Sequence, residues 1–281
     1  MLHPASLPEA LAALAERGDE ARVLAGGTAV VLLLYQKLIF PDVLVNLGRV
    51  PGLDTIRVEE DGLHLGPLVL LRDVELSPQV QQEWPGLAQA CGVVGNVRVR
   101  NQATIGGNLA EADYASDPPA MLLALDAAVT VASATGSRAI PLADFYLGFY
   151  TTALQPDELI TGVFVPRLPA SARMAYLKFK TRSSEDRPCL GVAAIGSFED
   201  GLCADLRVAV GAATEIPRRL PEVEALARGQ SLTDELIAEI AEGYASQVDT
   251  LDDIRASSWY RTQMIRVHVR RALQEVCNGR R

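Results

Sequence analysis

Residues 7–15 carry leucines at every third or fourth position, the spacing that places apolar side chains on one face of a helix. Pro8 stands near the start of this segment, where its missing amide costs least. Two short apolar runs follow at 23–25 and 43–47, and each predicts a buried strand. Because residues 29–36 read as a helix between those strands, this part of the chain predicts a compact β-α-β unit.

Between residues 54 and 165 the pattern of apolar and polar positions, with the turn residues that interrupt it, predicts a series of short strands and helices. Residues 54–66 alternate around a Glu-Asp-Gly turn and predict a hairpin. The remaining elements are predicted from apolar runs and from the prolines that start or stop them: a helical region at 71–92, a helix at 120–125, strands at 128–132 and 158–165, and an aromatic-rich turn and loop at 141–149.

The proline-rich segment 166–171 is the best candidate for a domain boundary. Beyond it, strand-like runs lie at 174–181, 191–198 and 203–210, an Asp-Gly turn predicts a hairpin between the last two, and helices follow at 221–228, 234–247 and 259–276. The predicted fold class is therefore α+β. A ligand-binding domain is expected over residues 1–167, and a smaller domain of a three-stranded antiparallel sheet plus helices over residues 168–281.

Two glycine pairs carry the most informative chemistry in the chain. They stand in Ala25-Gly26-Gly27-Thr28-Ala29 and Thr104-Ile105-Gly106-Gly107-Asn108. Glycine reaches positive φ and lets a ligand approach the backbone, and successive amides in such a turn suit phosphate oxygens. A single pair reads as an ordinary tight turn, but two pairs, with Ser116-Asp117 downstream, predict one polyanionic ligand held from two sides. Neither a P-loop nor a Rossmann glycine pattern occurs.

The composition is that of a globular protein and disfavours several partners. Apolar residues make up 49% of the 281 residues, charged residues 22%, and the net charge is −9. Because no basic stripe interrupts this acidic background, we expect no nucleic-acid binding. The N-terminus lacks a signal-peptide pattern, and the longest apolar run, 29–35, is far shorter than the ~20 residues of a membrane span. We therefore expect no membrane span and a cytoplasmic protein.

The four cysteines and three histidines are scattered along the chain, with no C-x-x-C pair. This spacing matches neither the common zinc patterns nor the common iron–sulfur patterns, so no metal site is predicted. A redox centre in this chain would have to be organic and bound without covalent attachment.

In order and spacing, these motifs resemble those of the FAD-binding medium subunits of the molybdenum hydroxylases, the family that includes carbon monoxide dehydrogenase and xanthine dehydrogenase. The landmarks run through the whole chain: Ala-Gly-Gly-Thr at 25–28, Thr-Ile-Gly-Gly-Asn at 104–108, Ser-Asp-Pro-Pro-Ala at 116–120, Phe-Lys at 179–180, Gly-Ala-Ala at 211–213 and the arginine-rich final helix. The resemblance implies a two-part FAD-binding domain of the PCMH type over residues 1–167 and a domain of the carbon monoxide dehydrogenase flavoprotein type over residues 168–281.

The resemblance also implies roles in FAD binding for individual residues, and it implies no catalytic residue. Ala25, Gly26, Gly27, Thr28 and Ala29 would form the pyrophosphate loop, and Thr104, Ile105, Gly106, Gly107 and Asn108 a second FAD loop with hydrogen-bonding side chains at both ends. Asp117 matches an acid that accepts a hydrogen bond from the cofactor; its alternative role is the N-cap of the following helix. Ile160 matches an apolar position near the flavin, or is a core residue. Lys180 matches a lysine near the flavin ring, or is an exposed lysine that ends a strand.

Two departures from the family pattern affect this interpretation. The chain has no cysteine-bearing insert of the kind that holds an extra cluster in some relatives, so a four-iron cluster is not expected. A proline that the family often has between the second motif and the acid is replaced here by Asp113-Tyr114. Tyr114 either stacks on or shields the flavin, or is an exposed loop tyrosine.

The resemblance implies electron transfer rather than substrate chemistry in this chain. A large subunit with the molybdenum cofactor would oxidise the substrate, and a small subunit with [2Fe–2S] clusters would pass the electrons to FAD here. The flavin would deliver them to NAD⁺, oxygen or a quinone, in an assembly that is a dimer of heterotrimers. Two alternatives are a free-standing FAD-dependent oxidase or reductase, and a non-catalytic scaffold that has lost its cofactor.

Overall fold

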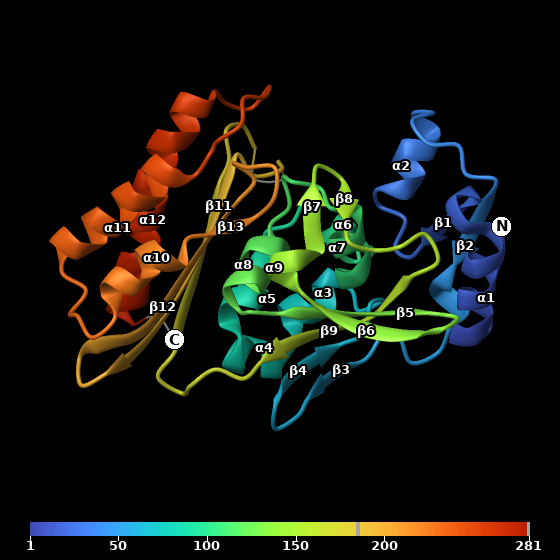
Figure 1. The fold of residues 1–281 in the computed structure, drawn as a ribbon, viewed down its shortest axis with the longest axis horizontal. Coiled ribbons are helices and arrows are strands. Elements are labelled where there is room, and N and C mark those ends of the chain that lie inside the picture. Colours follow the sequence, from blue (N-terminus) through green and yellow to red (C-terminus); the bar gives the residue numbers. More distant parts are fainter. Residues whose placement is uncertain (184–185, 280–281) are drawn as a thin grey trace.

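Three hydrophobic clusters, each centred on a different stretch of the chain, organise the fold. The computed structural model describes residues 1–183 and 186–279 (Figure 1). The first cluster lies in the N-terminal β-α-β unit, the second between helices and a five-stranded sheet, and the third between a four-stranded sheet and the C-terminal helices. The helices and strands are mixed along the chain as expected, which confirms the α+β fold class.

The β-α-β unit predicted at the N-terminus is present. Helix α1 (Leu7–Arg17) begins after Ser6, whose hydroxyl accepts a hydrogen bond from an amide of the first turn. Strand β1 (Ala21–Leu24) pairs in parallel with β2 (Val43–Asn46), and α2 (Val30–Tyr35) lies between them in the chain. The loop from β1 to α2 contains the first glycine pair.

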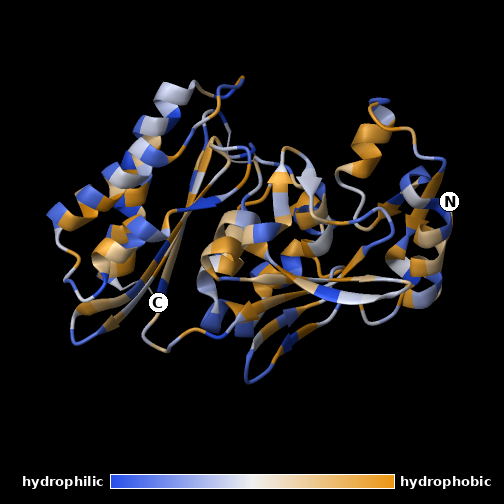
Figure 2. Cartoon of the chain, viewed as in Figure 1, coloured by the Kyte–Doolittle hydropathy of each residue, from blue (hydrophilic) through white to orange (hydrophobic). Residues whose placement is uncertain are grey.

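Helix α2 is apolar, yet none of its side chains is buried. Val31, Leu32 and Tyr35 are 57%, 49% and 86% exposed, and Leu38 and Phe40 are exposed just beyond the helix. Figure 2 shows α2 as a hydrophobic arm that stands away from the rest of the chain. These five residues are called the α2 patch below. Exposed apolar side chains that gather on one element are typical of surfaces that contact another molecule.

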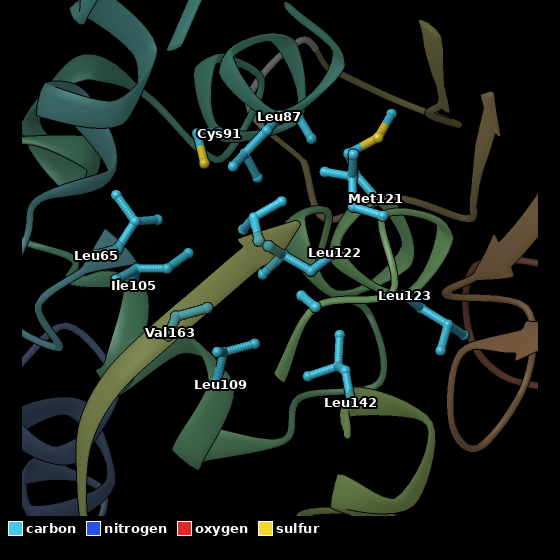
Figure 3. Close-up of a cluster of buried hydrophobic side chains, with 14 of the residues drawn as sticks. Leu65, Leu87, Cys91, Ile105, Leu109, Met121, Leu122, Leu123, Leu142 and Val163 are labelled. Carbon is cyan, nitrogen blue, oxygen red and sulfur yellow. The ribbon is translucent and has the colours of Figure 1, made fainter. Parts of the chain in front are cut away.

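A five-stranded antiparallel sheet with the order β3-β4-β9-β5-β6 underlies the middle of the molecule. Its strands are β3 (Ile56–Val58), β4 (Gly62–Leu65), β5 (Ala128–Ser133), β6 (Gly136–Pro141) and β9 (Leu159–Pro166). The helices of this part are α3 (Leu71–Leu76), α4 (Pro78–Glu83), α5 (Pro85–Gly92), α6 (Val97–Arg100), α7 (Ile105–Glu111) and α8 (Pro118–Ala124), of which α3, α6, α7 and α8 lie above the sheet in Figure 1. Figure 3 shows Ile105 and Leu109 of α7 beside Val163 of β9 in the buried cluster.

The C-terminal sheet is antiparallel and has the order β10-β11-β12-β13. Its strands are β10 (Arg173–Phe179), β11 (Leu190–Glu199), β12 (Leu202–Gly211) and β13 (Arg218–Arg219), and its helices are α10 (Pro221–Glu224), α11 (Asp234–Gln247) and α12 (Ser258–Asn278). The sheet contains the three predicted strands and a fourth, β13, which was not predicted. β13 is an edge strand of two residues and is too short to produce a sequence pattern. The predicted hairpin turn is present, with Asp200 and Gly201 at φ of 50° and 82°. Within the described ranges, no helix has both the length and the apolar character needed to cross a bilayer.

The C-terminal sheet lies between two layers of helices. Its outer face packs against α11 and α12 in the third cluster. From its inner face, Tyr176, Ala193, Ile195 and Ala209 belong to the same buried cluster as the helices of the middle part, with α8 against β11 and β12 (Figure 1). The loop before α8 is therefore within reach of side chains from β10.

Two segments differ from the sequence prediction. Residues 141–149 were predicted as a turn and loop, but they form helix α9 (Leu142–Phe145) and strand β7 (Tyr146–Gly148), which pairs with β8 (Thr151–Thr152). Burial of the α9 side chains in the middle cluster holds that segment in place. Residues 104–108 were predicted as a glycine turn, but their second residue already begins helix α7.

Candidate functional site

The two glycine motifs, far apart in the sequence, lie against each other in the structure. A Cβ added at Gly26 would stand 1.8 Å from the backbone oxygen of Gln102, two residues before the second motif. A Cβ added at Gly107 would stand 3.7 Å from the Cβ of Ala25. The structure therefore brings both motifs together, and only a residue without a side chain fits at position 26.

The first motif is a loop with unused backbone donors. Gly27 has φ of +73°, the left-handed region that glycine adopts without strain. Within the described part of the chain, the amides of residues 26–29 donate to no backbone or side-chain acceptor. Thr28 is exposed and its neighbours are partly buried, so the loop is open to a ligand. Consecutive free amides are the donor set that phosphate oxygens require.

The second motif has a different construction from the one predicted. Thr104 is the N-cap of α7, and its buried hydroxyl accepts a hydrogen bond from the amide of Gly107 at 3.1 Å. The amide of Ile105 donates to the carbonyl oxygen of Val69, that of Gly106 to Pro67 and that of Asn108 to Thr104. Neither glycine adopts a positive φ. The expectation of a free-amide turn was therefore wrong here, because the capped helix uses these donors internally.

The glycines of the second motif are explained by close contacts. A Cβ added at Gly106 would stand 2.6 Å from the Cβ of Pro67, and one at Gly107 would stand 2.8 Å from Oγ1 of Thr104. Ile105 points into the hydrophobic cluster (Figure 3). Only Gly107 and Asn108 remain partly exposed. These two residues are the ones through which the motif can meet a ligand.

Asn108 is held by the loop that leads to α8. Its Nδ2 donates to Oγ of Ser116 at 2.9 Å, and Oγ of Ser116 donates to its Oδ1 at 3.1 Å. Ser116 directly precedes Asp117, so the side chain of the second motif is linked to the position of the acid. The loop 113–117 thus connects the second glycine motif to the side chains that bind Asp117.

Asp117 is buried, 2% exposed, and bonded to the C-terminal domain. Its Oδ1 accepts from the hydroxyl of Tyr176 and its Oδ2 from Nζ of Lys178, both at 2.8 Å. Asp117 occupies the N-cap position of α8, as its alternative role implied, but its side chain makes no capping bond to the helix. Burial raises the pKa of Asp117 to about 6, although the neighbouring lysine cations and the tyrosine hydroxyl oppose the shift. The role of Asp117 as a hydrogen-bond acceptor for a cofactor stays a prediction.

Sequence reasoning selected Lys180 and missed Lys178, two residues earlier. The side chain of Lys178 is 3% exposed, and its Nζ also donates to the carbonyl oxygen of Val93 at 2.8 Å. Lys180 follows β10, is partly buried, and is close enough for its charge to lower the pKa of Asp117. Tyr176 and Lys178 alternate along β10 and so share one face, and Lys180 continues the same spacing just beyond the strand. This period-two set of polar residues was the signal available in the sequence.

Ile160 and Tyr114 lie in contrasting surroundings. Ile160 is 4% exposed in β9 and belongs to the middle cluster, as its alternative reading as a core residue implied. Tyr114 is partly buried and tied to the C-terminal domain: its hydroxyl donates to Oδ2 of Asp253 at 2.8 Å and accepts from Arg255 at 2.9 Å. Burial and the bond to Asp253 raise the pKa of Tyr114. Tyr114 is therefore not a free loop tyrosine.

Among the residues that the structure describes, potential metal ligands gather at one place, which is not at the glycine motifs. In the described portion of the chain, the one group with suitable spacing is Glu59, Asp61 and His64 at the β3–β4 hairpin. Both acids are exposed, and the histidine ring bonds to Asp61 at 2.9 Å. Exposed carboxylates beside a histidine at a hairpin are a common surface arrangement, and we assign no site to them.

Comparisons with known proteins agree on one family. The profile described as FAD binding domain in molybdopterin dehydrogenase matches residues 1–168, and the profile described as CO dehydrogenase flavoprotein C-terminal domain matches residues 175–276. The chain is 36% identical to the 6-hydroxypseudooxynicotine dehydrogenase complex subunit alpha of Paenarthrobacter nicotinovorans, covering 98% of this chain and 93% of the relative. It is 34% identical to the glyceraldehyde dehydrogenase medium chain of Sulfolobus acidocaldarius, covering 96% and 95%.

Solved structures show the same similarity in three dimensions. A carbon monoxide dehydrogenase from Hydrogenophaga pseudoflava that lacks the Mo-pyranopterin moiety superposes with a TM-score of 0.94 at 31% identity, over 98% of this chain and 95% of that one. Quinoline 2-oxidoreductase from Pseudomonas putida 86 superposes with a TM-score of 0.93 at 29% identity, over 99% and 96%. The match therefore extends through both domains.

Proposed function

Since this chain belongs to the family of FAD-binding subunits of the molybdopterin dehydrogenases, we propose that it transfers electrons within a molybdenum hydroxylase complex. The family membership confirms the resemblance inferred from the sequence. It also confirms FAD as the cofactor and an oxidoreductase flavoprotein subunit as the type of protein. The individual binding residues and the path of the electrons are the proposed parts.

The loop of unused amides at residues 26–29 carries the proposal, because it fits the pyrophosphate of FAD. The four amides of residues 26–29 have no acceptor in the protein and can donate to phosphate oxygens. These donors would offset the repulsion between the phosphates and a chain whose net charge is −9. Gly107 lies beside Ala25 at the start of this loop, and with the adjacent Asn108 it would border the same ligand. Bound FAD supplies the capacity to accept and release electrons. The chain contributes its binding and electrostatic environment.

Lys180 is proposed as the cation nearest the flavin ring. Its charge already acts on Asp117 within the group of side chains that links β10 to the loop before α8. A positive charge beside the ring favours the electron-rich reduced form and so raises the reduction potential of FAD. Ile160 lies in the core, and its proposed role is to form part of the apolar wall behind the FAD site.

The proposed partners are a large subunit with the molybdenum cofactor and a small subunit with [2Fe–2S] clusters. Relatives are named as a subunit of a dehydrogenase complex and as medium chains, names that denote multi-subunit enzymes. The α2 patch offers this chain an apolar surface for such a contact. Electrons would pass from the clusters to FAD here and then to an external acceptor, in a dimer of heterotrimers.

The domain boundary is also a proposal, with residues 1–167 as the FAD-binding domain and residues 168–281 as the C-terminal domain. The segment between β9 and β10 contains the prolines that separate them. Limited proteolysis between residues 167 and 172 is the direct measurement. Because the inner face of the C-terminal sheet belongs to the middle cluster, we expect the two fragments to stay associated after cleavage.

Flavin reduction by substrate tests the electron-transfer proposal. The chain loaded with FAD would be mixed with the substrate of the complex, first alone and then with both partner subunits, and the flavin absorbance followed. We expect bleaching only with the partners present, while dithionite bleaches the flavin in both samples. Substrate-dependent bleaching of the isolated chain would instead support a free-standing oxidase or reductase.

A further inference from the structure

We propose that Lys178 is a positioning residue for the cofactor site. It holds Asp117 and, through the adjacent Ser116, sets the place of Asn108 at the second glycine motif. This inference rests on the proposed cofactor site and adds to it a side chain from the C-terminal domain. Lys178 need not touch FAD for this role, because it acts through the loop 113–117.

The first step is the anchorage of Asp117. Lys178 is directed inward from β10 and makes two hydrogen bonds of 2.8 Å, one to Oδ2 of Asp117 and one to the carbonyl oxygen of Val93. The side chains of Lys178 and Asp117 are each 3% exposed, so water does not compete for the pair. The second oxygen of Asp117 is held by Tyr176, whose hydroxyl is itself confined, since a Cβ at Gly191 would stand 2.4 Å from it.

The second step runs from Asp117 to the glycine motif. Ser116 and Asp117 are consecutive, so a shift of the acid moves the serine. Both polar atoms of the Asn108 side chain are bonded to Oγ of Ser116, at 2.9 and 3.1 Å. Asn108 is one of the two residues of its motif that remain partly exposed. The position of its side chain is therefore set by contacts that begin on β10.

A second ion pair between the two domains provides a matched control. Asp126 follows the C-terminal end of α8, whereas Asp117 precedes its N-terminal end. Asp126 is paired with Arg207 and Arg219 of the C-terminal sheet. It therefore joins the same helix to the same sheet, but it has no hydrogen bond to the glycine motifs. If FAD affinity depended only on the strength of the contact between the two domains, removal of either ion pair would weaken FAD binding.

The experiment compares Lys178→Met, the double variant Asp117→Asn/Lys178→Met and the control Asp126→Asn in the full chain. For each we would measure the dissociation constant of FAD, the circular dichroism of the bound flavin and the melting temperature without FAD. Lys178→Met leaves a buried carboxylate without its partner and lowers the melting temperature. The double variant removes both charges and recovers much of that loss, so it keeps the test informative if the single variant does not fold.

We expect both Lys178 variants to bind FAD at least tenfold more weakly and to alter the flavin circular dichroism, even where the melting temperature recovers. Asp126→Asn should leave the affinity and the flavin signal unchanged. Wild-type affinity in the double variant, or an equal loss in Asp126→Asn, would overturn the positioning role. Gly27→Val separates a failure of the positioning role from a failure of the proposed FAD site. If Gly27→Val abolishes FAD binding and Lys178→Met does not, the FAD site is supported and the positioning role of Lys178 is refuted. If FAD binding is unchanged in both variants, the FAD site itself is refuted.

Discussion

Replacement of Gly26 by alanine is the most direct perturbation of the contact between the two glycine motifs. The added Cβ would stand 1.8 Å from the oxygen of Gln102 and 2.7 Å from its carbonyl carbon, and both are backbone atoms that cannot rotate away. Side-chain Cβ atoms do not approach other atoms within 3.0 Å, so one backbone segment must move by about 1.2 Å. Overpacking of this kind costs about 1–3 kcal/mol, or about 2–10 °C in melting temperature.

The same displacement acts on FAD affinity, because it separates the loop of free amides from the second motif. Loss of two hydrogen bonds to charged oxygens, each worth about 1.5–3 kcal/mol, weakens binding by about 100-fold or more. Gly26→Ala would be compared with Gly136→Ala, where no atom lies within 4 Å of the added Cβ and about 0.5 kcal/mol is the largest change expected. Titration of FAD by flavin fluorescence and thermal unfolding measure both effects. Wild-type affinity and stability in Gly26→Ala would refute the view that the two motifs form one site.

Three further predictions concern single residues. Gly107→Val should displace the Thr104 cap, cost about 1–2 kcal/mol in urea unfolding and lower FAD affinity; retention of one FAD per chain would contradict the role of this motif. Lys180→Gln should make the midpoint potential of bound FAD more negative in a potentiometric titration, and an unchanged potential would place the cation elsewhere. Asp253→Asn should cost about 3 kcal/mol at neutral pH because Arg261, fully buried, loses its partner. Burial alone would raise the pKa of Asp253, but hydrogen bonds from Arg261, the Arg255 amide and Tyr114 hold it below its ordinary value of 3.8. Its stabilisation is present above that value and is lost as the pH falls below it, so the difference between Asp253→Asn and wild type should shrink in urea unfolding at acid pH.

Local patterns predicted most of the helices and strands, because their causes lie within a few residues. The Asp-Gly pair at 200–201 adopts the left-handed conformation that the hairpin needs. Helix α11 was predicted at its observed bounds, 234–247, because Thr233 caps it and its apolar residues share one face. Two-residue strands such as β13 depend on a neighbouring strand and leave no pattern of their own.

The candidate site was harder to predict, because its contacts join distant residues. The second glycine pair resembles a turn, and only the structure shows that contacts with Pro67 and Thr104 exclude larger side chains there. Asp117 was selected from the sequence, but its partner Lys178 lies 61 residues away. The alternation along β10 does not distinguish Lys178 from Lys180, because which of the two reaches Asp117 is decided by the packing of β10 against α5 and by the bond from Lys178 to Val93.

The dependence of the loop 113–117 on the C-terminal domain has a consequence for the order of events during biosynthesis. Asp117 precedes Lys178 by 61 residues, and Tyr114 precedes Asp253 by 139. At about 5–20 residues per second, a ribosome needs roughly 7–28 s to synthesise that longer interval. Until the end of this interval the nascent FAD-binding domain has its glycine motifs but lacks the complete set of side chains that hold the loop beside them, because Tyr176 and Lys178 are made before Asp253. Flavin loading is therefore expected as a late, post-translational step, and a chain that stops before residue 253 would leave the ribosome without a completed cofactor pocket.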